Sequence, residues 1–419
     1  MENTNSNWAI RFYTLWTGQA LSLLGSQLVQ FAIIWYLTQE TNSATTLAIA
    51  SMMGLLPQVL LSPFIGTWVD RGNRRLIMMF ADGAVALSTA ALAILFAMDM
   101  IQVWHIYVAL FIRAVGGGFH QSAFGASVVL LVPKDQLGRV QGFNQALYGA
   151  MNIISAPLGA YLLAILPMQG ILAIDVSTAF IAITIVFLTS IPQPQRSEEA
   201  AASSFWQDFV AGYRYIVTWR GLMIILILAM VINFFFSATE PLTPLLIKNH
   251  FNGGASQLGL WLALFSVGTL LGGLILGIWG GFKRKIVTAL TGLIVMGFLT
   301  FGIGVIPSNM FIAALIITTI FGLSIPIVNG SIGATLQSSI KPDMQGRVFA
   351  FIQSIAMLVS PLALIVAGPF ADRFGIQPWF ILAGCICAAM GVLGFFFPEV
   401  MGIETTPHKE ALDVAAEPS

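Results

Sequence analysis

The sequence predicts an all-α membrane protein in which twelve transmembrane helices form two six-helix repeats. Three observations support this fold class: the composition, a series of long apolar stretches, and a motif that recurs in both halves. Of the 419 residues, 57% are hydrophobic and 9% are charged, whereas soluble domains carry roughly 25% charged residues. The 18 Lys and Arg residues balance the 18 Asp and Glu residues, so no basic surface is expected for a phosphate backbone. The composition therefore excludes an ordinary soluble enzyme, a disordered chain and a nucleic-acid-binding protein.

The apolar stretches are each long enough to cross a bilayer as a helix, which takes about 20 residues. A helix also satisfies its own backbone polar groups, as hydrocarbon surroundings require. The first six stretches are Phe12–Leu37, Thr46–Val69, Leu76–Met98, Val103–Val132, Val140–Leu166 and Ile171–Ile191. The second six are Leu222–Ile247, Leu258–Phe282, Ile286–Ile306, Phe311–Ile340, Val348–Phe370 and Pro378–Phe397.

The distribution of basic residues predicts the topology. With the N-terminus inside, fifteen Lys and Arg residues lie in inside segments, only Lys248 and Arg373 lie outside, and Arg113 lies within a helix. Basic residues collect on the cytoplasmic side of membrane proteins. Both termini are therefore expected in the cytoplasm, and a bacterial inner membrane is the expected location.

Composition also divides the chain into four parts. Residues 1–191 form a first six-helix bundle, and 192–220 form a polar cytoplasmic linker that contains an amphipathic helix. Residues 221–398 form the second bundle, and the polar tail 399–419 is expected to be disordered. Because its aromatic residues cluster near one face, the linker helix is expected to lie in the membrane interface.

The two halves share a sequence repeat. Residues 135–145 (DQLGRVQGFNQ) match residues 343–353 (DMQGRVFAFIQ) at an offset of 208. Both segments lead through an inside loop into the fifth helix of their half. Parallel repeats around a central site are typical of transporters whose halves rock, although a single-chain channel could carry a repeat as well.

The loop after the second stretch carries Gly66, Asp70, Arg71, Arg74 and Arg75 in the order G-x-x-x-D-R-x-x-R-R. This loop resembles the inside-loop signature of the major facilitator superfamily, and the six-plus-six topology extends the resemblance over nearly the whole chain. The resemblance implies that Asp70 holds the cytoplasmic side closed against helix eleven. Its expected partner is Arg347 or the positive end of that helix.

The basic residues of this loop have a second interpretation, because Arg74 and Arg75 would serve equally well to set the topology. The corresponding loop of the second half has Gly281 in place of the aspartate, followed by Lys283, Arg284 and Lys285. The same gate contact is therefore absent or differently built there.

Four charged residues lie within the predicted helices, where charge is costly and marks ion or substrate paths. Arg113, followed by Gly116 and Gly117, resembles the family's helix-four R-x-x-x-G pattern, which implies proton coupling; a structural ion pair is the alternative. The acids are Asp82, Asp175 and Glu240, and each could be a proton or substrate site or a satisfied carboxyl group. Glu240 is the first choice, because Pro241 and Pro244 free backbone carbonyls beside it. His120 is interpreted as a packing or hydrogen-bonding group.

Other polar and aromatic residues are candidates for the wall of a central cavity. They are Asn144, Asn152, Asn233, Asn329, Trp16, Trp35 and Phe31. Helix five, which contains Pro157, partly resembles the Gly-Pro antiporter motif of exporters. No phosphate loop, metal-ligand motif or hydrolase motif is present in the sequence, so no enzyme activity, metal or cofactor is predicted.

Several stretches in both halves, among them residues 12–20, 32–38 and 110–116, resemble the macrolide-efflux branch of the superfamily. This resemblance implies an exporter that exchanges protons for macrolides or other amphipathic, drug-like compounds. Its partners would be the substrate, protons and the lipid bilayer, and the protein is expected to be a monomer. An exporter of siderophores or lipid-like metabolites is the alternative within this fold. A transport-inactive membrane scaffold or receptor is the alternative of another class.

Overall fold

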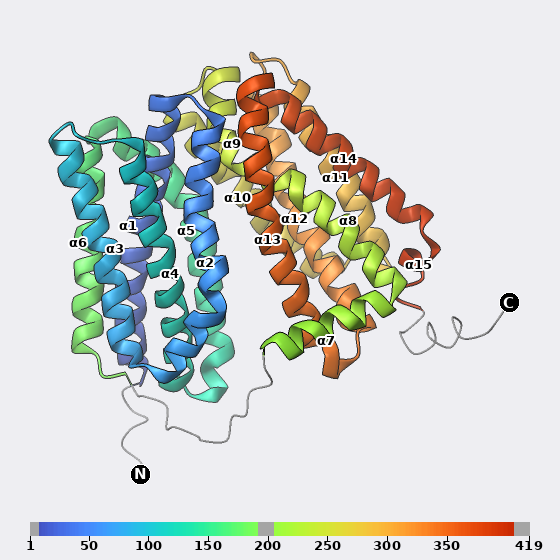
Figure 1. Cartoon of the computed structure of the whole chain (residues 1–419), viewed down its shortest axis with the longest axis horizontal. Coiled ribbons are helices and arrows are strands. Elements are labelled where there is room, and N and C mark those ends of the chain that lie inside the picture. Colours follow the sequence, from blue (N-terminus) through green and yellow to red (C-terminus); the bar gives the residue numbers. More distant parts are fainter. Residues whose placement is uncertain (1–7, 192–204, 406–419) are drawn as a thin grey trace, which may run out of the picture. The chain divides into compact units, whose positions relative to one another are not determined.

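The computed structural model describes residues 8–191 and 205–405, which are helical almost throughout (Figure 1). The expectations for residues 1–7, for the linker segment 192–204 and for the tail 406–419 fall outside these described residues. The chain divides into two compact units. The first takes its described residues from 1–42, 49–200 and 254–263, and the second from 43–48, 201–253 and 264–419.

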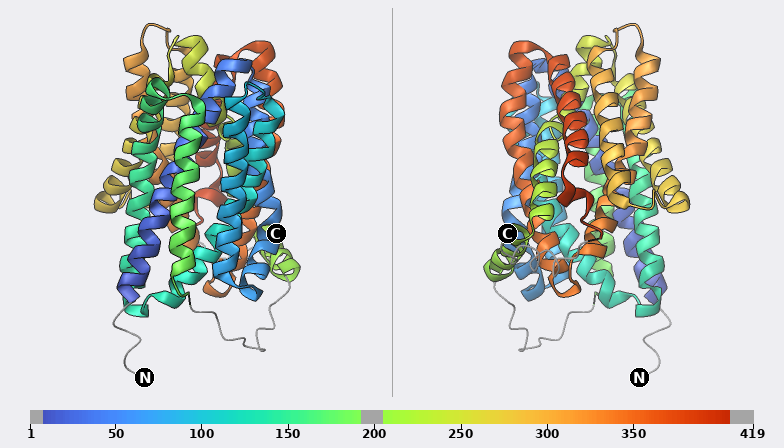
Figure 2. Two further views of the ribbon diagram at one scale, coloured as in Figure 1. Left: turned by 90° about the vertical axis from the view of Figure 1, so that its left-hand side faces the viewer. Right: turned by 90° about the vertical axis from the view of Figure 1, so that its right-hand side faces the viewer.

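The first unit is a bundle of long helices that run side by side (Figures 1 and 2). They are α1 (Trp8–Thr41), α2 (Ala44–Arg71), α3 (Arg74–Ala97), α4 (Val103–Leu131), α5 (Leu137–Ile165) and α6 (Met168–Leu188), with a 3-10 turn η1 (Lys134–Gln136) before α5. Helix α3 packs against α4 and α6, and α1 packs against α5 and α6. Asn73 begins α3, since its side chain accepts hydrogen bonds from the backbone N–H groups of Arg75 and Leu76.

The second unit holds the remaining helices. They are α7 (Phe205–Thr218), α8 (Arg220–Phe236), α9 (Thr239–Leu245), the π-helical turn η2 (Leu246–His250), α10 (Ala255–Trp279, whose first turns belong to the first unit), α11 (Lys285–Val305), α12 (Phe311–Ser339), α13 (Pro342–Phe374), α14 (Ile376–Phe396) and α15 (Pro398–Met401). Helices α11 and α14 approach closely through glycine, because a Cβ atom at Gly384 would lie 2.3 Å from the backbone nitrogen of Phe301.

The first turn of α2 belongs to the second unit because of one carboxylate. Asp372, near the end of α13, accepts hydrogen bonds from the backbone N–H groups of Ala44 (2.6 Å) and Thr45 (3.0 Å) and from the Ser43 hydroxyl (3.0 Å). An acidic side chain at a helix N-terminus satisfies its free N–H groups and complements the helix dipole. The sequence had given no sign of this contact.

Eleven helical segments of the described chain are long and apolar enough to cross a membrane, against the twelve stretches predicted. Helix α4 falls short of this apolar composition because Arg113, His120 and three consecutive glycines interrupt it, although its 29 residues suffice in length. The predicted seventh stretch is a single span that is broken after Phe236 into α8, α9 and η2. Pro241 and Pro244 lack the N–H groups that would continue the ladder.

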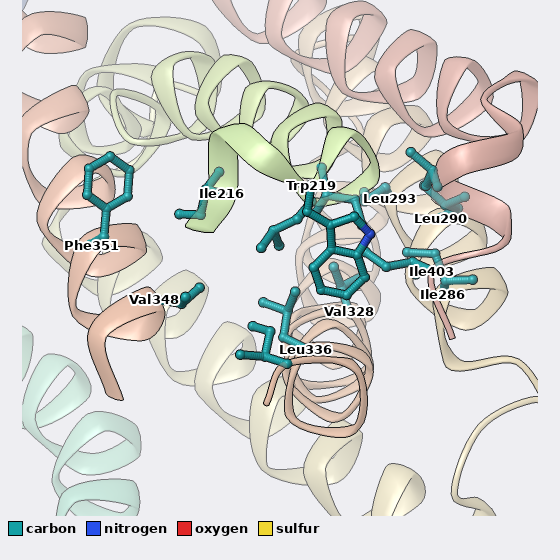
Figure 3. Packing of buried hydrophobic residues seen from close by; sticks show 14 of the residues in the cluster. Ile216, Trp219, Ile286, Leu290, Leu293, Val328, Leu336, Val348, Phe351 and Ile403 are labelled. Atoms are coloured by element: carbon teal, nitrogen blue, oxygen red, sulfur yellow. The ribbon is translucent and has the colours of Figure 1, made fainter. Parts of the chain in front are cut away.

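A hydrophobic core ties α7 and α8 to α11, α12 and α13 (Figure 3). The ring of Trp219, 4% exposed, lies among Val328, Leu336 and Ile403. Helix α7 runs next to α13, where a Cβ atom at Gly212 would lie 2.6 Å from the backbone oxygen of Arg347.

The start of the C-terminal tail corrects the prediction of disorder from Glu399 onward. Val400 and Ile403 are fully buried in the core of the second unit. Glu404 Oε1 accepts hydrogen bonds from the backbone N–H of Ile286 (2.8 Å) and from the Thr335 hydroxyl (3.0 Å). Residues 399–405 are ordered because their two apolar side chains fill this core and their carboxylate caps α11.

Candidate functional site

A buried ion pair joins two helices of the first unit, α4 and α6. The Nη1 atom of Arg113 on α4 lies 2.7 Å from Oδ2 of Asp175 on α6. The Arg113 side chain is 10% exposed and that of Asp175 is 1% exposed. Of the four charged residues found by sequence, the structure thus brings two together.

Hydroxyl and carbonyl groups complete the hydrogen bonding of this pair. Arg113 Nη1 also donates to the Thr89 hydroxyl on α3 (2.8 Å), and its Nη2 donates to the backbone oxygen of Ser26 on α1 (3.1 Å). The Thr89 hydroxyl lies 3.1 Å from Asp175 Oδ2, and the Ser26 hydroxyl donates to Asp175 Oδ1 (3.1 Å). Both carboxylate oxygens therefore have partners, as a buried charge requires.

Helix α1 is held against the pair by a glycine. A Cβ atom at Gly25 would lie 2.4 Å from the Thr178 hydroxyl and 3.1 Å from Asp175 Oδ1. Only a residue without a side chain therefore fits between α1 and α6 at this level. The pair is therefore held in place by close backbone packing between α1 and α6 as well as by its own hydrogen bonds.

The chemistry of the pair is asymmetric, because guanidinium keeps its proton at any physiological pH. An ionised carboxyl group only accepts hydrogen bonds, so the negative charge of Asp175 complements the donors of Arg113, Thr89 and Ser26.

The third acid, Asp82 on α3, pairs with His120 on α4. Asp82 Oδ1 lies 2.7 Å from His120 Nδ1, and their side chains are 11% and 20% exposed. The imidazole ring also stacks on Phe124, with ring centroids 6.1 Å apart. Sequence reasoning treated Asp82 and His120 separately and missed the pair. Their proximity depends on α3 and α4 packing as antiparallel neighbours, which the local sequence does not show.

Glu240 lies in the first turn of α9, directly after the break in the span. Its side chain is exposed. The break itself is fixed by the indole N–H of Trp379, which donates to the backbone oxygen of Phe235 (3.2 Å). The role of Glu240 as a proton or substrate site stays a prediction.

The gating candidates of the first unit lie at one end of the bundle. Asp70 is largely exposed and contacts Arg74 at 3.8 Å. Arg74 Nη1 donates to the backbone oxygen of Ala126 (2.9 Å), and Arg75 Nε donates to that of Val186 (3.1 Å). Both arginines thus also tie α3 to the ends of neighbouring helices.

The remaining gating candidates are exposed residues. Arg71 and Gly66 are exposed, and a Cβ atom at Gly66 would meet no atom within 4 Å. Arg347 is exposed near the start of α13, with Nη1 lying 3.8 Å from Met344 Sδ.

The cavity candidates fall into three groups: hydrogen-bonded, exposed and buried residues. Trp16 donates to Asn144 Oδ1 (2.8 Å), and Asn233 accepts from the Ser360 hydroxyl (3.3 Å). Asn152 and Asn329 are exposed. Phe31 and Trp35 are buried, each with 7% of its surface exposed. Phe31 packs where Gly159 leaves room for its ring.

Sequence reasoning selected Asn152 on α5 but missed three further exposed amides on α4 and α5. Gln121 on α4 and Gln141, Gln145 and Asn152 on α5 are exposed. Positions three or four residues apart share one face of a helix, and polar groups facing lipid are costly. Amides at this spacing within an apolar stretch are the signal that could have predicted a face in contact with water or substrate.

Within the described residues no cluster of three metal-ligating side chains occurs. Long apolar helices, a broken span and a buried charge pair together define a polytopic α-helical membrane transporter. The sequence profile of the Major Facilitator Superfamily matches residues 15–246 and 225–416. The chain belongs to this superfamily and is a multi-pass transporter, not an enzyme, which confirms the predicted fold and class.

Relatives and solved structures agree with this assignment. The chain is 35% identical to Macrolide efflux protein A of Streptococcus pyogenes, over 94% of this chain and 97% of that protein. It is 26% identical to the Multidrug efflux pump Tap of Mycolicibacterium fortuitum, over 91% and 94% of the two chains. The crystal structure of the nucleoside transporter NupG matches with a TM-score of 0.72 at 12% identity and covers 93% of this chain and 99% of its own. That likeness supports the fold alone.

Proposed function

We propose that this protein is a secondary active exporter of amphipathic drug-like compounds, with macrolides as the main class, and that it exchanges them for protons by alternating access. The buried Arg113–Asp175 pair is the observation that carries the proton coupling. It combines a permanently charged group with a carboxylate that can be neutralised, inside a segment where unpaired charge is costly. The names of the relatives support the substrate class.

In this proposal the protein lies in a bacterial inner membrane with both termini in the cytoplasm. Protons enter from outside, neutralise Asp175 and loosen its hold on Arg113. The carboxylate of Glu240 would receive a basic group of the substrate, because it offers a charge in an otherwise apolar segment. Macrolides that carry a basic amine match the carboxylate.

The decisive experiment measures macrolide efflux from cells that express the protein, with and without a proton uncoupler. We expect efflux that stops when the uncoupler is added. Efflux that survives the uncoupler would remove proton coupling, and siderophore or lipid-like metabolite efflux without macrolide efflux would favour the alternative substrate class. A complete lack of flux with any of these compounds would favour a scaffold or receptor.

Asp70, with Arg347 or the start of α13 as partner, is proposed to close the cytoplasmic side. Asp70→Asn should lower the rate of macrolide efflux while leaving membrane insertion unchanged, because the exposed carboxylate adds little to stability. Asp99→Asn, in the exposed turn between α3 and α4, is the matched control. Normal efflux by the Asp70 variant would refute this gate.

A further inference from the structure

The interface between α3 and α4 contains a second charge pair, which lies at a different level along the two helices from the first. Asp82 lies seven residues before Thr89 on α3, and His120 lies seven residues after Arg113 on α4. Seven residues correspond to about 10 Å along a helix axis, and the two helices are antiparallel neighbours. The Asp82–His120 contact of 2.7 Å is therefore a separate polar level of the same interface.

The two levels are held in register by close packing between them. A Cβ atom at Gly116 on α4 would lie 2.7 Å from a methyl group of Val85 and 3.1 Å from the backbone oxygen of Ala81 on α3. The backbones approach so closely here that Asp82 and His120 have little freedom to separate. The pair is a fixed element of the bundle.

The second pair differs from the first in its hydrogen bonding. Asp82 Oδ2 is buried and has no hydrogen-bond partner among the described residues. A buried carboxylate oxygen without a donor is unusual in a folded protein, and such atoms often mark functional positions. A proton that binds this oxygen displaces no hydrogen-bond donor, whereas a proton that binds Asp175 must displace a donor that is already there.

Several ionisable side chains lie on the helices around this pair. The ionisable side chains on the neighbouring helices are Arg11, Tyr13, Tyr36 and Glu40 on α1, Asp70 and Arg71 on α2, Arg74 and Arg75 on α3, His105, Tyr107 and Arg113 on α4, and Asp175 on α6. Those of α2 and the two charged ends of α1 are exposed. Arg74, Arg75 and Arg113 contact Ala126, Val186 and Asp175 respectively.

We infer that Asp82 and His120 form a second proton-binding site, separate from Arg113–Asp175, which takes up and releases one proton in each transport cycle. Imidazole is the side chain that changes charge between about pH 5 and 8. The site lies between the Arg113 level and the end of α3 that carries Arg74 and Arg75. The transport role rests on the proposed function, whereas the proton binding does not.

Proton binding is tested on purified protein with isotope-labelled histidine by NMR. The chain has four histidines, and His120→Gln identifies the signal of interest. We expect that signal to titrate with pH and its titration to change in Asp82→Asn. A His120 signal that does not respond to pH, or that responds identically in Asp82→Asn, would overturn the inference even if the protein exports macrolides.

The transport role is tested by the pH profile of macrolide transport in proteoliposomes. His120→Gln and Asp82→Asn should flatten the profile between about pH 5 and 8 and lower the number of protons moved per macrolide. His105→Gln, in the first turn of the same helix, is the matched control and should keep the wild-type profile. A wild-type profile in the His120 variant would overturn the role, while the uncoupler experiment tests the proposed function separately.

Discussion

The two charge pairs of the first unit differ in what surrounds the carboxylate. Asp175 has hydrogen-bond partners at both oxygens and a guanidinium that keeps its charge, whereas Asp82 has one unpartnered oxygen and an imidazole that does not. Both acids lie in apolar helices and look alike in the sequence. The difference teaches that the partner, more than burial alone, decides how a membrane carboxylate responds to protons.

The largest effect is expected at the first pair. Arg113→Met should lower the free energy of unfolding by about 3–5 kcal/mol, because it leaves the carboxylate of Asp175 buried without its partner. Denaturation in mixed micelles measures this loss. The double variant Arg113→Met/Asp175→Leu should regain most of the stability, since replacing both charges by apolar groups is often neutral.

The double variant also separates structure from function. We expect it to fold and insert like the wild type but to show no proton-coupled efflux. Recovered coupling in this variant would mean that the pair serves only to hold the helices together.

A smaller effect is expected at the second pair. Asp82→Asn should cost about 1 kcal/mol, because only one oxygen has a partner and the amide can still face His120. The same denaturation assay compares it directly with Arg113→Met. Equal losses at the two positions would contradict the contrast drawn between the pairs.

The smallest effect is expected from Thr89→Val, which removes one hydroxyl from the first pair and leaves the Arg113–Asp175 contact in place. A loss of about 0.5–1.5 kcal/mol is typical of one hydrogen bond. Ser26→Ala removes a hydroxyl from the other carboxylate oxygen and serves as the companion variant. If either change abolished coupling, the hydroxyls and not the ion pair would carry the function.

The fold was predictable because the lengths of the apolar stretches and the uneven distribution of basic residues can be read directly from the sequence. The break in the seventh span followed in the same way from Pro241 and Pro244. The individual charges Arg113, Asp82 and Asp175 were also visible, because charge is rare in these helices. Their pairing was not, since it depends on which helices touch and at what register.

Contacts between distant segments were beyond sequence reasoning for the same reason. Nothing in the local pattern relates Asp372 to the start of α2, or Glu404 to the start of α11, because each carboxylate caps a helix far away in the chain. The loops before α3 and before α11 illustrate the point. Asn73 caps α3 from within its own loop, whereas α11 relies on Glu404 from the C-terminal segment.

Proton flux through the first pair is the central claim, and one measurement tests it most directly. Proteoliposomes with an internal pH dye report the protons moved as a macrolide gradient is applied. We expect macrolide-driven proton flux with the wild type and with Asp99→Asn, and fewer protons per macrolide with Asp175→Asn, although the latter still binds macrolide. An unchanged number of protons per macrolide in Asp175→Asn would contradict the account.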